Sequence, residues 1–324
     1  MEQTKHRIGY IDLVKGWVIF LVIWVHTDSP SWVTASFVNA FFFFVSGLFF
    51  RKYEFGEFSK KQVNGLLVPF IFFYLISYPF RIVVHYWDFQ TLTTFDWGCI
   101  LDIFKSEGRS DYLFVNVPLW FILCIFFVRY YYWFICKNKK WVLLIIAIIL
   151  LMSQTSINKV ATPFMMNNAL YWLGFFIIGN LSANLLKVED WKKRLIAIIA
   201  SGVAAVILYF SEKYVDSKLF LHAVVHLERI LIIIFTIFIF SFLDNVRCLN
   251  PLRFMGENTL AVLGYHLLIL IPLGRIAHKL SGGEQYPYLI GLSCSILTAF
   301  ISYFIIKLSN KYIPTLVGKK GLIK

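Results

Sequence analysis

The sequence predicts an all-α fold, a polytopic membrane bundle of about ten transmembrane helices in which residues 1–324 form a single integral-membrane domain. Of the 324 residues, 59% are hydrophobic and 15% are charged, whereas soluble domains are nearer to half apolar and a quarter charged. The apolar residues also fall in blocks of about 18 to 22 residues, the length that a helix rising 1.5 Å per residue needs to cross about 30 Å of hydrocarbon.

Polar segments set the limits of these blocks. The fourth block ends at "KNKK", "LKVEDWKK" separates the sixth from the seventh, and "SGGEQYP" separates the ninth from the tenth. The fifth block is shorter than a bilayer requires, and the eighth begins with charged residues. In chain order, the predicted spans are 8–27, 33–50, 67–86, 117–136, 141–155, 165–186, 193–211, 226–243, 258–277 and 287–309.

The Lys and Arg residues between the blocks predict the orientation. If the N-terminus is cytoplasmic, nineteen of them lie on the cytoplasmic side and seven on the opposite side. This bias follows the positive-inside rule, so we expect a multi-pass protein of the inner (plasma) membrane with both termini in the cytoplasm. Topology therefore accounts for the net charge of +13, which gives no indication of nucleic-acid binding.

Other local signals have simpler interpretations. The segment "VTA" at 33–35 resembles a signal-peptide cleavage site, but Asp12 and Lys15 interrupt the apolar stretch before it, which favours an uncleaved first helix. The five cysteines are odd in number and lack CxxC spacing, so they are interpreted as small buried hydrophobes. The loop 87–116 is long and rich in carboxylates, and we expect it to cover an outward-facing site.

The first block carries three ionisable residues on one face. Lys15 and His26 are eleven residues apart, which is about three helical turns and about 16 Å along the axis. Asp12 precedes Lys15 by one turn. Taken singly, Lys15 would snorkel to the membrane surface and Asp12 would neutralise it. Together on one face they indicate a functional interior, because ionisable groups within spans are costly.

Five segments in the same order resemble motifs of the acyltransferase 3 family of integral-membrane O-acyltransferases, most closely the branch related to fucose 4-O-acetylase. They are "RIGYIDLVKGWVIFLVIWVH", "FVNAFFFFVSGLFFRK", "SKKQVNGLLVPF", "VPLWFILCIFF" and "MGENTLAVLGYHLLIL". The first has the family's basic residue, ten residues and then His, as Lys15 and His26, although many members carry Arg at the basic position. Asn64 and Gly65 stand in the third segment, where the family normally has a further Arg.

The resemblance implies transfer of an acyl group, usually acetyl, from acyl-CoA to a hydroxyl of a cell-surface glycan or its lipid-linked precursor. The donor's phosphates would be held by Lys15, with Asp12 beside it, and by Lys60 and Lys61. Its pantetheine arm would reach the imidazole of His26, which acts either as general base on the acceptor hydroxyl or as an acyl-histidine nucleophile. His266, in the last motif, is the second catalytic candidate.

Further polar residues are candidates for binding the acceptor: Arg81, Trp120, Glu228, Arg229 and Asn258. Arg81 has snorkelling as its simpler interpretation, and Asn258 has helix capping. His222 and His226 are four residues apart, a spacing that binds zinc, but without a third ligand no metal is expected.

Two other classes of function remain as alternatives. A transporter or flippase of a polysaccharide intermediate would use the same buried charges as a proton or substrate path. A purely structural scaffold is disfavoured by the number of ionisable groups within the spans.

Overall fold

The computed structural model describes residues 8–27, 29–30, 37–104, 115–157, 159–164, 166–281 and 287–323. Within these ranges the chain forms helices and no β-strand, which confirms the predicted all-α class. The possible cleavage site at 33–35 lies outside the described residues, as do residues 105–114 of the long loop.

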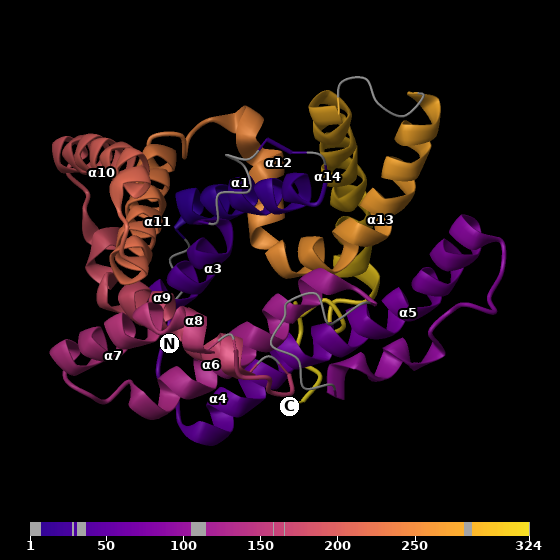
Figure 1. Ribbon diagram of the computed structural model, residues 1–324, viewed down its shortest axis with the longest axis horizontal. Helices are drawn as coiled ribbons and strands as arrows, with labels where there is room; N and C mark the ends of the chain where they lie inside the picture. The colour runs from indigo at the N-terminus through magenta and orange to yellow at the C-terminus, as the bar shows by residue number, and fades with distance from the viewer. Residues whose placement is uncertain are drawn as a thin grey trace.

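Each of the ten apolar blocks contains a helix, and short additional helices occur between them (Figure 1). The α-helices are α1 (Gly9–Val25), α3 (Phe37–Leu48), α4 (Phe55–Gln62), α5 (Val68–Phe89), α6 (Trp120–Ile135), α7 (Lys140–Met152), α8 (Gln154–Ile157), α9 (Met166–Leu181), α10 (Trp191–Ser211), α11 (Lys218–Ser241), α12 (Asn250–Glu257), α13 (Thr259–Leu280) and α14 (Pro287–Tyr312). A π-helical turn, Val63–Leu67, joins α4 to α5, and 3-10 turns form Trp97–Phe104, Val117–Leu119, Ala183–Lys187, Glu212–Tyr214 and Arg247–Leu249.

Six helical segments of the described chain are long and apolar enough to cross a membrane, so the predicted count of about ten spans is not confirmed. These are Phe55–Phe89, Val117–Ile135, Trp191–Tyr214, Lys218–Ser241, Thr259–Leu280 and Pro287–Tyr312. Helix α3 has 12 residues and α7 has 13, so each is about 18 to 20 Å long and shorter than the hydrocarbon core. Apolar composition predicted both helices, and the block that contains α7 was already predicted to be shorter than a bilayer requires.

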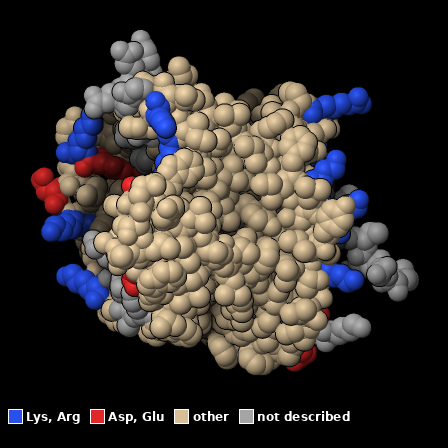
Figure 2. Space-filling view, turned by 90° about the vertical axis from the view of Figure 1, so that its right-hand side faces the viewer, with Lys and Arg blue, Asp and Glu red and all other residues tan. Residues whose placement is uncertain are grey.

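The surface has the distribution of side chains expected of a membrane protein. Figure 2 shows a broad band without charged side chains between two edges where the Lys, Arg, Asp and Glu residues gather. Helix α10 contributes large exposed hydrophobic side chains, with Ile196 65%, Ile199 57% and Val203 55% exposed. Side chains of this kind are stable at a surface that contacts lipid, which agrees with the six apolar segments.

Helix α1 lies between α11 on one side and α13 and α14 on the other (Figure 1), and it also contacts α3 and α12. Two glycines bring α1 and α12 into backbone contact. A Cβ atom on Gly16 would lie 1.7 Å from the carbonyl oxygen of Leu252, and one on Gly256 would lie 1.6 Å from that of Asp12. Small residues allow such close approach between helices. The position of the helix that carries Lys15 and His26 is therefore fixed by α12.

Candidate functional site

A cavity of about 1590 Å³ lies between α1, α3, α6 and the start of α13. Helix α1 lines it with Asp12, Lys15, Ile19, Val22 and His26, which recur every three or four residues along one face. Lys15 and His26 therefore open into the same cavity, in the arrangement that their spacing predicts. Eleven residues of helix separate them, or about 16 Å along the axis.

At one end of the cavity, cationic side chains are partly neutralised by neighbouring carboxylates. Lys15 Nζ lies 2.9 Å from Asp12 Oδ1, and the two side chains are 24% and 8% exposed. Lys61 lines the cavity and pairs with Glu57 at 2.5 Å, while its Nζ lies 3.3 Å from the centre of the Tyr53 ring. Lys60, predicted to act with Lys61, is not among the described residues that line the cavity.

Arg129 is a cavity residue that the sequence reasoning missed. It lies on α6, and its Nη1 donates to Ser46 Oγ on α3 at 3.3 Å. The signal was present, because Arg129 interrupts an apolar run and an ionisable residue within a span is a functional candidate. The sequence did not reveal that α6 places this side chain in the same cavity as Lys15.

At the other end, two imidazoles face one another. The ring centres of His26 and His266 are 5.3 Å apart. His266 is fully buried, and its Nδ1 lies 2.9 Å from the carbonyl oxygen of Leu263 and 3.2 Å from that of Val262. Carbonyl oxygens only accept, so Nδ1 carries the proton and Nε2 of the neutral ring is an acceptor. No group among the described residues hydrogen-bonds to that Nε2.

His26 also lines a second cavity, of about 320 Å³, on the far side of the two imidazoles. Thr27, Arg275 and His278 contribute polar groups to its wall. Arg275 is held by α5, because its Nε and Nη2 donate to the two carboxylate oxygens of Asp88 at 2.7 and 2.5 Å. His26 is therefore reached from two cavities, a large one that Lys15 also lines and a small one with a mostly apolar wall and a few polar groups.

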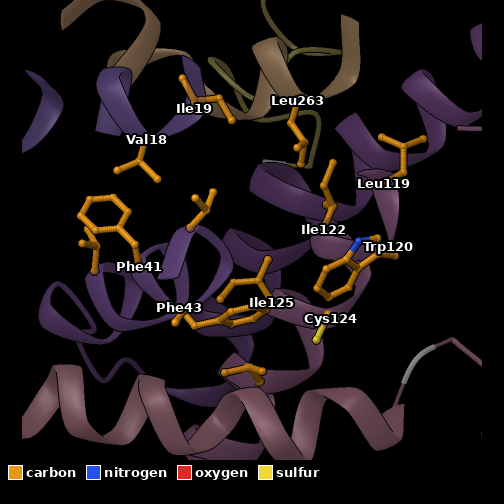
Figure 3. Packing of buried hydrophobic residues seen from close by; sticks show 14 of the residues in the cluster. Val18, Ile19, Phe41, Phe43, Leu119, Trp120, Ile122, Cys124, Ile125 and Leu263 are labelled. Carbon is orange, nitrogen blue, oxygen red and sulfur yellow. The ribbon is translucent and has the colours of Figure 1, made fainter. Parts of the chain in front are cut away.

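Aromatic and aliphatic side chains form the middle of the large cavity. Figure 3 shows five of the side chains that line it: Ile19 of α1, Trp120, Ile122 and Ile125 of α6, and Leu263 of α13. Val18 of α1, also shown there, packs in the core outside the cavity lining. Trp120, a predicted acceptor-binding residue, is only 9% exposed and belongs to the wall of this cavity at the start of α6. The middle of the cavity is thus apolar, between an imidazole end and a cationic end.

Four other predicted acceptor-binding residues lie elsewhere: none of Arg81, Glu228, Arg229 and Asn258 is among the described residues lining either cavity. Arg229 Nη1 donates to Tyr171 Oη at 3.0 Å, joining α11 to α9. Asn258 begins α13, but its side chain does not cap that helix. Instead its Nδ2 donates to the carbonyl oxygen of Phe254 at 2.7 Å, and its Oδ1 accepts from Asn310 at 2.9 Å.

The zinc-like spacing of His222 and His226 does not create a ligand cluster. His226 Nε2 is 3.0 Å from the carbonyl oxygen of Leu151, and its Nδ1 is 3.5 Å from Arg229 Nη1. Within the described ranges, no group of three or more His, Cys, Asp or Glu side chains is arranged to hold a metal ion. The candidate chemistry therefore belongs to the imidazoles and cations of the cavities.

Comparison with known proteins identifies the family. The model of the acyltransferase 3 family, described as an acyltransferase domain, matches residues 8–307. The chain belongs to this family. No curated protein and no solved structure matches the chain. The family and the six membrane-capable segments make the protein a membrane acyltransferase, and nothing supports the transporter alternative.

Proposed function

We propose that this acyltransferase moves an acetyl or other short acyl group from acyl-CoA to a hydroxyl of a cell-surface glycan or its lipid-linked precursor. One observation carries the proposal: Lys15 and His26 open into a single cavity, about 16 Å apart along α1. An extended pantetheine arm spans about that distance, so a donor held by its phosphates at the Lys15 end would present its thioester to His26.

The acceptor would reach His26 through the smaller cavity. That cavity is about 320 Å³, at the lower end of the range for small-molecule sites, and Thr27, Arg275 and His278 offer groups that hydrogen-bond to a sugar. With Lys15 toward the cytoplasm, donor and acceptor would approach the imidazole from opposite sides of the inner membrane.

Two routes are compatible with this arrangement. In the first, the oxygen of the acceptor hydroxyl attacks the thioester carbonyl while His26 accepts the hydroxyl proton. The imidazolium of His26 then returns that proton to the departing thiolate. In the second, an imidazole nitrogen attacks the thioester, thiol leaves, and the hydroxyl then takes the acyl group from His26. In both, Nε2 of His266, whose ring centre is 5.3 Å from that of His26, is an acceptor that would hold an imidazole N–H or a water in place.

The test uses purified protein in nanodiscs with acetyl-CoA labelled in the acetyl group, together with cells in which the glycan's base-labile acetate is measured. Wild type is expected to bind acetyl-CoA and to support O-acetylation. His26→Ala is expected to bind acetyl-CoA equally well and to lose transfer by about 10²- to 10⁴-fold. Label retained on wild-type protein, but not on His26→Ala, identifies the acyl-histidine route. Wild-type protein that binds no acyl-CoA contradicts the proposal.

The finer resemblance to the branch related to fucose 4-O-acetylase suggests a deoxyhexose or related sugar as the first acceptor to try. We also propose that both termini lie in the cytoplasm and that residues 1–324 form one domain. Accessibility of single cysteines introduced at either end to a membrane-impermeant thiol reagent tests that orientation.

A further inference from the structure

Among the described residues, Arg129 is a partly buried cation for which no ion pair is found. Its guanidinium opens into the large cavity, Nη1 contacts only the Ser46 hydroxyl at 3.3 Å, and its buried Nε has no hydrogen-bond partner among the described residues. By comparison, Arg253 pairs with Asp244 at 3.0 Å and Arg275 with Asp88 at 2.5 Å. A guanidinium removed from bulk water and left without an anion is unfavourable.

The cavity itself supplies no carboxylate for Arg129. Among the described residues that line it, the only acidic one is Asp12, and Asp12 is already 2.9 Å from Lys15. Lys61 has its own partner in Glu57. Arg51 also lines the cavity near Arg129's end and brings a further positive charge. The lining thus has an excess of positive charge that an anionic ligand would balance.

The segment beside Arg129 is held firmly against α6. Trp133, one turn further along α6, donates from Nε1 to the carbonyl oxygen of Tyr53 at 3.0 Å. Phe58 of α4 packs on Trp133 and Tyr130, with ring centres 6.1 and 5.1 Å away. The loop that carries Arg51 and Tyr53 is therefore fixed next to Arg129, and the cationic surface is preorganised.

We propose that Arg129 binds the phosphate groups of the acyl donor inside the large cavity. Phosphate is the anion that a guanidinium binds best, because its fork of N–H groups engages two oxygens at once. The unpartnered Nε is one of the donors that such a fork uses. A carboxylate ligand would use the same fork, but most of the other residues that line the cavity are apolar, which suits a phosphate group attached to an extended neutral chain. The proposal rests on the proposed function, since it takes acyl-CoA as the donor.

Lys15 is a weaker candidate for this role than the sequence indicates. Its charge is compensated by Asp12, so an incoming phosphate gains less from it than from Arg129. Arg129 is thus the principal phosphate ligand among the four Lys and Arg residues in the described lining of this cavity.

The test compares donors with and without phosphates. Binding of acetyl-CoA and of S-acetylpantetheine is measured by titration calorimetry on the full chain in nanodiscs, for wild type, Arg129→Gln, Arg129→Lys and the control Arg247→Gln, whose exposed side chain lies outside both cavities. Arg129→Gln is expected to raise the Kd for acetyl-CoA by about ten- to hundredfold, the range for a lost charge-assisted hydrogen bond, and to leave that for S-acetylpantetheine unchanged. Adenosine 3′,5′-bisphosphate is expected to compete with acetyl-CoA on wild type and much less on Arg129→Gln.

The outcomes separate this proposal from the one on which it rests. If wild type binds acetyl-CoA but Arg129→Gln binds it equally well, or if the variant weakens both donors by the same factor, the role of Arg129 is overturned while acyl transfer stands. If wild type binds no acetyl-CoA, both are overturned. If Arg129→Gln does not fold, Arg129→Lys provides the test, since Lys keeps the charge and loses the fork. The Kd of Arg129→Lys is then expected to rise by less than tenfold for acetyl-CoA and to stay unchanged for S-acetylpantetheine.

Discussion

The contact between α1 and α12 provides a prediction that links stability to activity. In Gly16→Ala, the added Cβ would lie 1.7 Å from the carbonyl oxygen of Leu252, and that separation must grow by about 1.3 Å to reach the 3.0 Å below which such contacts essentially never occur. The obstacle is backbone, so no side chain can rotate away. Overpacking of this kind costs about 1–3 kcal/mol. Gly16 adjoins Lys15, so the displacement also moves the stripe that lines the cavity.

We therefore expect Gly16→Ala to lower the thermal midpoint by several degrees and to lower acyl transfer by about ten- to hundredfold, since a displacement of about 1 Å at an active site is enough for such a loss. The assays are intrinsic-fluorescence melting in detergent and the acetyl-CoA-dependent transfer described above. Gly56→Ala is the matched control, because a Cβ at Gly56 in α4 has nothing within 4 Å. If Gly16→Ala melts and turns over like Gly56→Ala, then α12 does not fix the position of α1.

Two further substitutions test the imidazole pair and the C-terminal segment. His266→Asn removes the Nε2 acceptor of the ring beside His26. We therefore expect acyl transfer to fall by about tenfold or more, while the Kd for acetyl-CoA, measured by calorimetry, stays unchanged. An equal loss of acetyl-CoA binding would mean that His266 only supports the fold. Asn64→Ala removes three hydrogen bonds, from Leu322 N and Ile323 N to Oδ1 and from Nδ2 to Ile323 O, at 2.8–2.9 Å. Because each is exposed and worth about 0.5–1.5 kcal/mol at most, limited proteolysis should cut the C-terminal segment faster with little change in the melting temperature.

The sequence was sufficient for properties that depend on local composition. Each predicted apolar block contains a helix, whereas the short helices α4, α8 and α12 were not predicted. The spacing of Lys15 and His26 is a property of one helix, and for that reason their common face could be deduced without a structure. The predicted count of about ten membrane crossings is not confirmed, since six helical segments of the described chain are long and apolar enough to cross a membrane.

Contacts between distant segments account for what the sequence did not reveal. Arg129 reaches the cavity because α6 packs beside α3, where Ser46 lies 83 residues earlier in the chain. Arg229 attracted attention as a charge within a span, yet its partner is the Tyr171 hydroxyl of α9, which explains it as a link between helices. Asn64, which with Gly65 occupies the stretch where the resemblance led us to expect Arg, holds the backbone of Leu322 and Ile323 with its amide.

The order of polarity along the large cavity restricts what kind of molecule fits it. Lys15, Arg51, Lys61 and Arg129 line it with cationic side chains, and most of the other lining residues are aliphatic or aromatic. The imidazole of His26 stands about 16 Å from Lys15 along α1. A ligand charged along its whole length would have to give up hydration in the apolar middle, and an uncharged ligand would leave the guanidinium of Arg129 without an anion. A molecule with an anionic head and a long neutral arm meets both requirements. Its reactive group then lies beside His26, which is the only imidazole among the described residues of the lining and is available to move a proton.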